Sequence, residues 1–391
     1  MTAPTRSLQD IDRLLAVAVD SGEVPGVCAV AVTADGVGYS GSWGHRAKGL
    51  PWTEDTVAWL GSMTKIITVT GALQLVEQGQ LKMDGGLGDI LPELAHPQVL
   101  EGFDDEGRPV LRPARTPITL RRLITHTAGN GYHFWNANVQ RYQRVNGLPG
   151  IIECRNVTLS KTPLVFDPGT AWEYGMNMDW VGKAIERVTG QDLERYLRQN
   201  VLDPLGMSAT SFRLTPSLRE NLAVMNARTA DGLVPIDFEM TQEPEFLMGG
   251  GGLYGSPADF LVLLRMLLGS GQVDGTRILR WETVDEAFRN QIGDLTIGKM
   301  TSADPASSND FEFMPGITKK WSLLGMYNVE ETPGGRSAGS LFWAGLPNAY
   351  FWVDRDRGNA GALFTQILPF ADPAVLDLFD RFENAVRALS E

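Results

Sequence analysis

The chain has 391 residues, of which 43% are hydrophobic and 21% are charged, and its formal net charge is −13. This composition is typical of a folded protein with a large core, and the length favours two domains or one two-lobed unit. The excess of acidic residues argues against a nucleic acid or an anionic membrane as a partner, because both require clustered Lys and Arg.

The N-terminal residues and the cysteines bear on the location of the protein. Asp10, Asp12 and Arg13 interrupt the apolar residues near the start of the chain, so we expect no signal-peptide core there. No later stretch is long and apolar enough to predict a membrane-spanning helix. Cys28 and Cys154 are the only cysteines. We therefore expect no disulfide framework and predict a reducing, cytoplasmic location.

The first part of the chain is predicted to form a helix followed by a hairpin. Apolar residues recur at helical spacing in 7–22. Two strand-like runs, 26–33 and 37–44, flank an Asp-Gly pair at 35–36, whose residue types favour a tight turn.

The middle of the chain is predicted to be mainly helical. A helix begins near Ser62 and is expected to stop at Gly79, a residue type common at helix ends. Between residues 80 and 255, helical patterns alternate with long loops that contain Pro and Gly, and no strong series of strands is evident. The helices expected in this region span 119–129, 178–190 and 192–207.

The last third of the chain is predicted to return to strands. After a helix at 257–271, a polar stretch at 301–320 has the length of a functional or mobile loop. Four strand-like runs and a closing helix follow, at 320–328, 339–346, 349–355, 359–368 and 372–389. Strands at both ends of the chain predict an α+β fold, in which one antiparallel sheet is flanked by helices and carries an inserted, mainly helical lobe. We expect a sheet domain of residues 1–80 and 256–391, a helical lobe of residues 81–255, and an active site between them.

A serine and a lysine stand three positions apart in "WLGSMTKIITV" (59–69), where a helix is expected to begin. Residues i and i+3 share one face of a helix, so Ser62 and Lys65 are predicted to point the same way. A serine hydroxyl needs a base to become a good nucleophile, and a lysine amine can be that base once burial or a second cation lowers its pKa. The motif is short, and a serine before an apolar run is also an ordinary helix N-cap.

Further segments give this pair more weight. Tyr174 lies in "PGTAWEYGMNMDWVG" (168–182), and Trp343-Ala344-Gly345 lies in "GSLFWAGLPNAYFWVDRDRG" (339–358). In this order and with these flanks, the segments resemble the serine β-lactamase and penicillin-binding-protein superfamily. They are most similar to its class C-like esterases, the family VIII carboxylesterases, and to the fungal statin side-chain acyltransferases. The resemblance extends from "PGVCAVAV" to "LFTQILPF", nearly the whole chain.

The resemblance implies a role for each of these residues. Ser62 would be the acylated nucleophile and Lys65 its partner. Tyr174 would be the general base, with its phenolate favoured by the Lys65 ammonium, and the two groups would titrate as a unit. The backbone N–H groups of Ser62 and Leu346 would form the oxyanion hole, because developing negative charge needs fixed donors.

The chain also departs from the pattern of β-lactamases at two motifs. Their third motif is usually Lys-Thr-Gly, whereas Trp343 stands here in place of the cation that would bind a β-lactam carboxylate. Trp343 and Gly345 remain candidate substrate-binding residues. The family's Tyr-x-Asn motif would place an Asn at position 176, where this chain has Met176. Asn177, one position later, is kept as a candidate substrate-binding residue.

Three other features allow different interpretations. Ser337 lies in "GRSAG", which matches the G-x-S-x-G motif of α/β-hydrolases, but a strand rather than a helix is expected after it. "GGGLYG" (250–255) matches a dinucleotide-binding motif without the surrounding βαβ pattern, so a loop that forms the floor of the site is favoured. His126 is a candidate base of a Ser-His-Asp triad, although a buried structural histidine is favoured.

The histidines and the aromatic residues bear on whether the site holds a metal ion or an apolar substrate pocket. The chain has four histidines, and none belongs to a zinc-binding motif, so neither a metal nor a cofactor is predicted. A group of aromatic residues either lines an apolar acyl pocket or belongs to the core. Its members are Tyr132, Phe134, Trp135, Trp172 and Trp343.

The sequence therefore predicts a cytoplasmic serine carboxylesterase of β-lactamase-like fold, which cleaves a small-molecule ester through an acyl-Ser62 intermediate and needs no cofactor. An acyltransferase, an amidase or a weak β-lactamase with the same Ser, Lys and Tyr residues is the alternative among enzymes. A non-catalytic, penicillin-recognition-like binding protein is the alternative outside enzymes. No oligomeric state is predicted.

Overall fold

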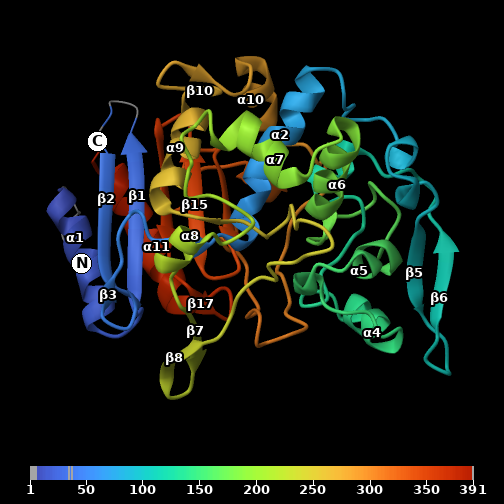
Figure 1. Cartoon of the computed structure of the whole chain (residues 1–391), viewed down its shortest axis with the longest axis horizontal. Coiled ribbons are helices and arrows are strands. Elements are labelled where there is room, and N and C mark those ends of the chain that lie inside the picture. The colour runs from blue at the N-terminus through green and yellow to red at the C-terminus, as the bar shows by residue number, and fades with distance from the viewer. Residues whose placement is uncertain (1–6, 34–35, 37, 390–391) are drawn as a thin grey trace.

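The computed structural model describes residues 7–33, 36 and 38–389. Its largest sheet contains eight strands, which are β1 (Gly26–Thr33), β2 (Gly38–Ala47), β3 (Leu50–Pro51), β12 (Lys319–Trp321), β13 (Met326–Asn328), β14 (Leu341–Gly345), β15 (Ala349–Asp354) and β16 (Asn359–Phe364). Their order in the sheet is β12-β13-β14-β15-β16-β1-β2-β3. β1 pairs antiparallel with β16, so the two ends of the chain meet in one sheet, as the adjacent blue and red strands of Figure 1 show. This arrangement confirms the predicted α+β fold.

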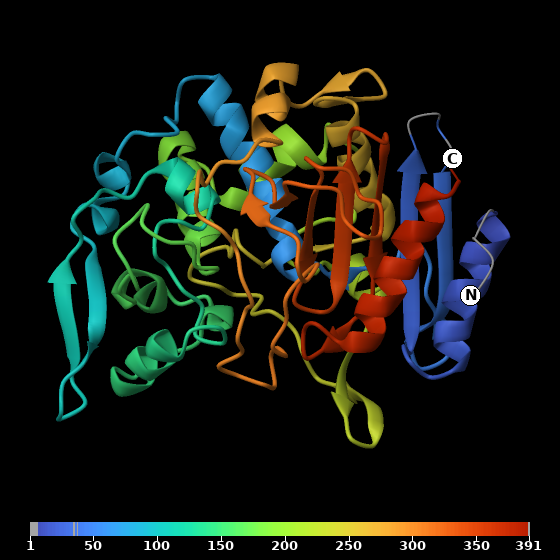
Figure 2. The same ribbon diagram turned by 180° about the vertical axis from the view of Figure 1, so that it is seen from behind.

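Helices cover both faces of this sheet. On one face, α9 (Pro257–Leu268) packs against β1, β15 and β16. On the other face, α1 (Leu8–Asp20) and α11 (Pro373–Arg387) pack against each other and against the sheet, as Figure 2 shows from behind. Strand β15 serves both layers, because its side chains alternate between the two faces. The ring of Phe351 lies 5.4 Å from that of Phe260 in α9, whereas the ring of Trp352 lies 5.6 Å from that of Phe382 in α11.

The middle of the chain is helical but also contains strands that the sequence did not predict. Its helices are α2 (Thr64–Glu77), α3 (Leu120–Ile124), α4 (Ala137–Val145), α5 (Asn156–Lys161), α6 (Asn177–Thr189), α7 (Leu193–Leu197) and α8 (Pro216–Glu220), and α10 (Trp281–Ala287) follows α9. Two hairpins also occur there, β5 (Gln98–Phe103) with β6 (Pro109–Pro113) and β7 (Met225–Thr229) with β8 (Gly232–Ile236). The expectation that this region lacks a series of strands was therefore wrong. All residues of β6 and β8 are exposed or half-buried, and their sequences, PVLRP and GLVPI, do not alternate apolar with polar residues as a half-buried strand does.

The strands near the C-terminus are shorter than expected. The run at 320–328 forms two strands, β12 and β13, because the Ser322 hydroxyl accepts hydrogen bonds from the N–H groups of Leu324 and Gly325 and closes a tight turn. The run at 359–368 divides into β16 and β17 (Ile367–Leu368), and β17 pairs with β7. A segment of the expected helical lobe is thus joined to the C-terminal part of the chain. The division into a sheet domain and a helical lobe stays a prediction.

Three other expectations concern single features of the chain. Cys28 and Cys154 are buried and form no disulfide. The tight turn predicted at 35–36 lies partly outside the described residues, because Asp35 is not among them. In the part of the chain that the structure describes, no helix combines the length and the apolar character needed to cross a membrane. The cytoplasmic location stays a prediction.

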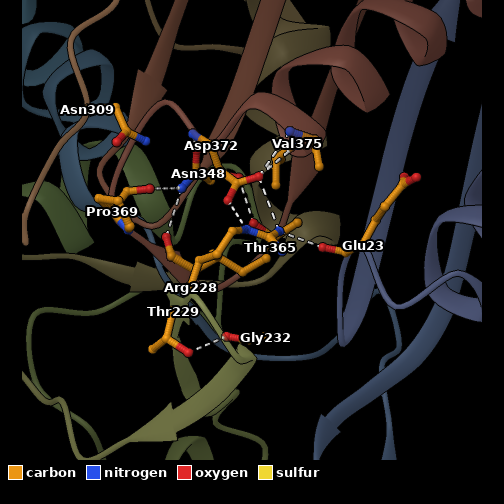
Figure 3. A network of polar contacts seen from close by, with 12 residues as sticks. Glu23, Arg228, Thr229, Gly232, Asn309, Asn348, Thr365, Pro369, Asp372 and Val375 are labelled. Atoms are coloured by element: carbon orange, nitrogen blue, oxygen red, sulfur yellow. Dashed lines mark hydrogen bonds and ion pairs between the residues drawn. The ribbon is translucent and has the colours of Figure 1, made fainter.

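A buried polar network fixes the turn between β14 and β15 (Figure 3). Asn348, in this turn, is fully buried, and its φ of 57° lies in the left-handed region that Asn tolerates better than most residues. Its Nδ2 donates hydrogen bonds to the carbonyl oxygens of Ile367 at 2.9 Å and Pro369 at 2.8 Å. Its Oδ1 accepts a hydrogen bond from the Asp372 N–H at 2.9 Å. The turn is therefore attached to the segment that leads into α11.

The same network continues through an ion pair. The Asp372 carboxylate caps the N-terminus of α11 and pairs with Arg228 of β7. Arg228 also donates a hydrogen bond to the Glu23 carbonyl oxygen at 2.6 Å. Asp372 is 1% exposed, so its charge depends on this partner. Segments from the start, middle and end of the chain thus meet behind the β14–β15 turn.

We predict that Asp372→Ala lowers the free energy of unfolding by about 2–4 kcal/mol, because Arg228 loses its buried partner and α11 loses its N-cap. The matched control is Asp377→Ala, also in α11, which removes an exposed i,i+4 pair with Arg381 and should cost less than about 1 kcal/mol. Urea unfolding of the two variants measures the difference. Equal losses would contradict the importance assigned to the network.

Candidate active site

Ser62 lies at the junction of a short 3₁₀ turn, Gly61–Met63, and helix α2. The N-cap position of α2 belongs to Met63, and neither the turn nor the helix has a side-chain cap. The Ser62 hydroxyl oxygen instead accepts a hydrogen bond from the Lys65 Nζ at 3.0 Å. The structure thus places the two side chains on one face, as predicted, and gives Ser62 no role as an ordinary helix cap.

The Lys65 amine is buried among oxygen atoms and aromatic rings. Its side chain is 4% exposed, and besides Ser62 its Nζ donates hydrogen bonds to the Tyr132 hydroxyl at 3.3 Å and to the Gly250 carbonyl at 2.5 Å. Burial lowers the pKa of Lys65, and the negative charge of Asp179 acts in the opposite direction. A lysine in this environment can lose its proton far more easily than one in water, which is what a general base requires.

Tyr174 meets Lys65 and Trp343 in the same buried space. The Lys65 Nζ lies 4.7 Å from the centre of the Tyr174 ring, and the Tyr174 hydroxyl accepts a hydrogen bond from the Trp343 Nε1–H at 2.8 Å. Burial raises the pKa of Tyr174, while Ser62 and Trp343 act in the opposite direction. Burial therefore disfavours both charged forms, the Lys65 ammonium and the Tyr174 phenolate.

The turn that follows β14 lies directly against the Ser62 segment. Gly61 has a φ of 51°, and a Cβ atom built on it would lie 2.8 Å from the Leu346 nitrogen. A Cβ atom on Gly345 would lie 2.2 Å from the Leu60 carbonyl oxygen. Both contacts are closer than a side chain allows, so glycine is required at each position. The two predicted oxyanion donors, the N–H groups of Ser62 and Leu346, thus belong to backbone segments in contact.

The glycine-rich loop at 249–252 is hydrogen-bonded to α2 and to the residues that precede it. The carbonyl oxygens of Gly249 and Gly251 accept hydrogen bonds at 2.7 Å from the Thr68 hydroxyl and the Trp59 indole N–H. Gly250 bonds to Lys65, as described above. A dinucleotide-binding loop leads from a strand into a helix. This loop leads instead into the short strand β9 (Tyr254–Gly255), so it does not belong to such a unit. Its place beneath Lys65 agrees with the expected floor of the site.

Asn177 and His126 form a separate, buried polar group behind Tyr174. The Asn177 Nδ2 donates hydrogen bonds to the His126 Nδ1 at 2.9 Å and to the Asn130 carbonyl at 3.2 Å, and its Oδ1 accepts one from the Asn130 Nδ2 at 3.0 Å. Asn177 is fully buried, so its amide points into the protein and is occupied there. It therefore supports the segment that carries Tyr174, and the structure does not direct it towards a substrate.

His126 lacks the partners of a catalytic triad. Its ring is fully buried, with its centre 4.5 Å from that of Tyr174, and burial lowers its pKa well below the ordinary value. Its Nδ1 faces the Asn177 amide rather than a carboxylate, and its Nε2 has no hydrogen-bond partner among the described residues. The structure thus favours the structural histidine over the triad base.

Ser337 lies in a loop outside the site. Its N–H donates to the Asp354 carboxylate at 2.8 Å, and the next regular element is strand β14, four positions further along the chain. The nucleophile elbow of an α/β-hydrolase needs a helix at this point, so the G-x-S-x-G match has no structural basis.

The aromatic residues divide between a cavity and the core. Trp135 and Trp172 are half-buried and line a cavity of about 420 Å³ that reaches Tyr174. Tyr132, Phe134 and Trp343 are at most 5% exposed and belong to the core. Ser62 does not line this cavity but borders a separate, mainly apolar one of about 10 Å³, the size of a single water molecule.

Two residues close to Lys65 were not identified from the sequence. Tyr132 belongs to no recognisable motif, and from the sequence it was grouped only with the other aromatic residues. Asp179 stands between Met178 and Trp180, and an acidic side chain among apolar helix residues is a signal that could have identified it. No group of three or more His, Cys, Asp or Glu side chains in the described part of the chain is arranged to hold a metal ion.

Comparison with known proteins agrees with this geometry. The model of the Beta-lactamase family matches residues 11–384. Monacolin J acid methylbutanoyltransferase of Aspergillus terreus is 34% identical over 389 residues, which cover 95% of this chain and 93% of that protein. Lovastatin esterase of Penicillium rubens is 32% identical over 399 residues, which cover 96% and 97% of the two chains.

A solved structure extends the similarity to three dimensions. A mutant of simvastatin synthase from Aspergillus terreus superposes with a TM-score of 0.84 at 31% identity, and the match covers 98% of both chains. These matches confirm the resemblance to class C-like enzymes and to the fungal statin side-chain acyltransferases, and with it the β-lactamase/transpeptidase-like fold. The chain belongs to the beta-lactamase family.

Proposed function

We propose that this protein is a serine carboxylesterase that cleaves small-molecule carboxylic esters through an acyl-Ser62 intermediate. The observation that carries the proposal is the 3.0 Å hydrogen bond between Ser62 and the buried amine of Lys65. A hydroxyl next to an amine with a lowered pKa is an activated nucleophile. Membership of an enzyme family whose relatives include an esterase and an acyltransferase supports ester chemistry.

Each group in the site has a step to perform. As the Ser62 Oγ attacks the ester carbonyl carbon, its proton passes to the Lys65–Tyr174 pair. The N–H groups of Ser62 and Leu346 stabilise the oxyanion of the tetrahedral intermediate. The pair then gives the proton to the leaving alcohol, the C–O bond breaks, and the acyl group remains on Ser62. A water molecule repeats the sequence and releases the acid.

An acyltransferase is the second candidate, because an alcohol can replace water in the last step. Two observations favour it. The first is the similarity to monacolin J acid methylbutanoyltransferase. The second is the cavity of about 420 Å³ beside Tyr174, which has room for an acceptor larger than water. The amidase, weak β-lactamase and non-catalytic alternatives have no comparable support.

β-Lactams are expected to be poor substrates. Trp343 stands in place of the usual cation. Its indole N–H donates a hydrogen bond to the Tyr174 hydroxyl and offers no positive charge to a substrate carboxylate. Met176 is 1% exposed and has no amide to hold an acylamino group. An apolar ester has neither a carboxylate nor an acylamino group, so it needs neither of these interactions.

We predict that kcat/KM for a short p-nitrophenyl ester exceeds that for nitrocefin by at least about 10- to 100-fold, because one missing charge-assisted hydrogen bond costs about 1.5–3 kcal/mol. Both substrates are measured on one preparation. An equal or higher value for nitrocefin would refute the esterase assignment.

A fluorophosphonate probe should form one covalent adduct, on the peptide that contains Ser62. Ser62→Ala should abolish labelling and esterase activity, whereas Ser337→Ala should retain both, because Ser337 lies in a loop outside the site and is followed by a strand instead of the helix of a nucleophile elbow. Intact mass and peptide mapping measure the outcome. Failure to label the wild-type protein at Ser62 would favour the non-catalytic binding protein.

Lys65 and Tyr174 should behave as one unit. If both serve a single proton transfer, Lys65→Ala, Tyr174→Phe and the double variant should lose similar factors in kcat, because the first change already removes the shared function. His126→Ala is the control, and it should lower thermal stability more than it lowers kcat. Additive losses at Lys65 and Tyr174, or a folded His126→Ala protein without activity, would contradict the scheme.

A further inference from the structure

Asp179 is a buried acidic residue next to the groups proposed for catalysis. It is the third residue of α6, and its side chain is fully buried. Its Oδ1 accepts a hydrogen bond from the Gly250 N–H at 2.8 Å. Its Oδ2 has no hydrogen-bond partner among the residues that the structure describes. A buried carboxylate oxygen without a partner is costly, so its presence needs a physical reason.

Structural support of the glycine-rich loop does not account for the charge. The Gly250 N–H needs only one acceptor, which the amide oxygen of an asparagine would supply without a buried carboxylate. The position of Asp179 in the first turn of α6 favours a negative charge, but this effect is smaller than the cost of burying an unpaired one. The negative charge itself must have a partner.

That partner is Lys65, reached through a single peptide group. The Gly250 N–H donates to Asp179, and the Gly250 carbonyl accepts from the Lys65 Nζ. A Cβ atom on Gly250 would lie 3.0 Å from the Asp179 Oδ1 and 2.9 Å from the Tyr132 hydroxyl oxygen, so all these groups surround the same residue. Burial lowers the pKa of Lys65 to about 7 and raises that of Asp179 to about 6, and the charge of each group opposes the shift of the other.

The other titratable groups around this pair carry little charge. Burial raises the pKa of Tyr132, Tyr174 and Cys154 and lowers that of His126, so all four are neutral near neutral pH. Lys183, one turn further along α6, is the other cation that acts on Asp179. Asp179 is thus the carboxylate that acts on the Lys65 amine from within the site.

We propose that Asp179 is a positioning residue whose negative charge makes the Lys65–Tyr174 pair a strong enough base to take the Ser62 proton. This inference rests on the proposed Ser62 mechanism. The working pair holds one proton fewer than the fully protonated pair, whether the remaining proton sits on Lys65 or on Tyr174. A nearby negative charge favours the protonated pair, so it raises the pKa at which the base forms and increases the base's affinity for the serine proton.

The sign of the pH effect follows from this assignment. Without the Asp179 charge, the pair binds its extra proton more weakly and becomes protonated only at a lower pH. The acid limb of the kcat/KM profile should therefore move to lower pH, and the plateau kcat should fall because the base is weaker. A residue with a purely structural role would lower activity without moving the limb.

The test uses Asp179→Asn and Asp179→Ser, which remove the charge but keep an oxygen that can accept from Gly250. We expect the acid limb to move down by about one pH unit or more and kcat to fall about tenfold or more, with KM nearly unchanged. Asp179→Glu restores the charge and should return the limb towards its wild-type position. Circular dichroism and the melting temperature establish that each variant is folded.

The matched control is Asp259→Asn in the first turn of α9. Asp259 is also a buried carboxylate that accepts hydrogen bonds, from the Ala209 N–H and the Thr210 hydroxyl, but it is not part of the site. Its neutral variant should lower the melting temperature and leave the acid limb in place. A folded neutral Asp179 variant with an unmoved limb would overturn the proposal, and so would the failure of both neutral variants to fold.

Ser62→Ala separates this inference from the proposed function. If Ser62→Ala remains active, the mechanism itself fails, whatever the Asp179 variants do. If Ser62→Ala is inactive and the acid limb of Asp179→Asn is unmoved, only the role of Asp179 fails.

Discussion

The burial of the Lys65 amine is the constraint on which the rest of the site depends. An ammonium group is stable in water, but the Lys65 side chain is 4% exposed and its hydrogen bonds go to oxygen atoms of Ser62, Tyr132 and Gly250. These oxygen atoms come from three separate segments of the chain. The fold must hold all three at hydrogen-bonding distance, because an amine buried without them would lose more in desolvation than the packing around it returns.

Glycine residues make this arrangement possible, because they let backbone segments touch where side chains would keep them apart. Gly61 admits the Leu346 nitrogen, and Gly250 admits the Tyr132 hydroxyl. The turn that carries Leu346 is held from behind by Asn348, which links it to the start of α11. The oxyanion donors proposed here therefore depend on a network that lies outside the site itself (Figure 3).

Trp343 shows how the family scaffold is adapted in this chain. Its position in the third motif faces the site, but its indole N–H is directed to the Tyr174 hydroxyl at 2.8 Å. An indole cannot supply a positive charge to a substrate, whereas it can orient a phenol and exclude water from it. The structure thus brings Ser62, Lys65 and Tyr174 together, while the residue at position 343 offers no positive charge.

The sequence by itself determined the features that arise from local geometry. The i,i+3 spacing of Ser62 and Lys65 places both on one helix face wherever the helix lies, and apolar runs such as 349–355 predicted strands. It missed β5–β6 and β7–β8, whose exposed residues carry no apolar alternation. Only the tertiary structure decided that Asn177 points inward, that His126 lacks a carboxylate, and that Asp179 reaches Lys65 through Gly250. Burial and charge depend on contacts between distant segments, and no local spacing encodes them.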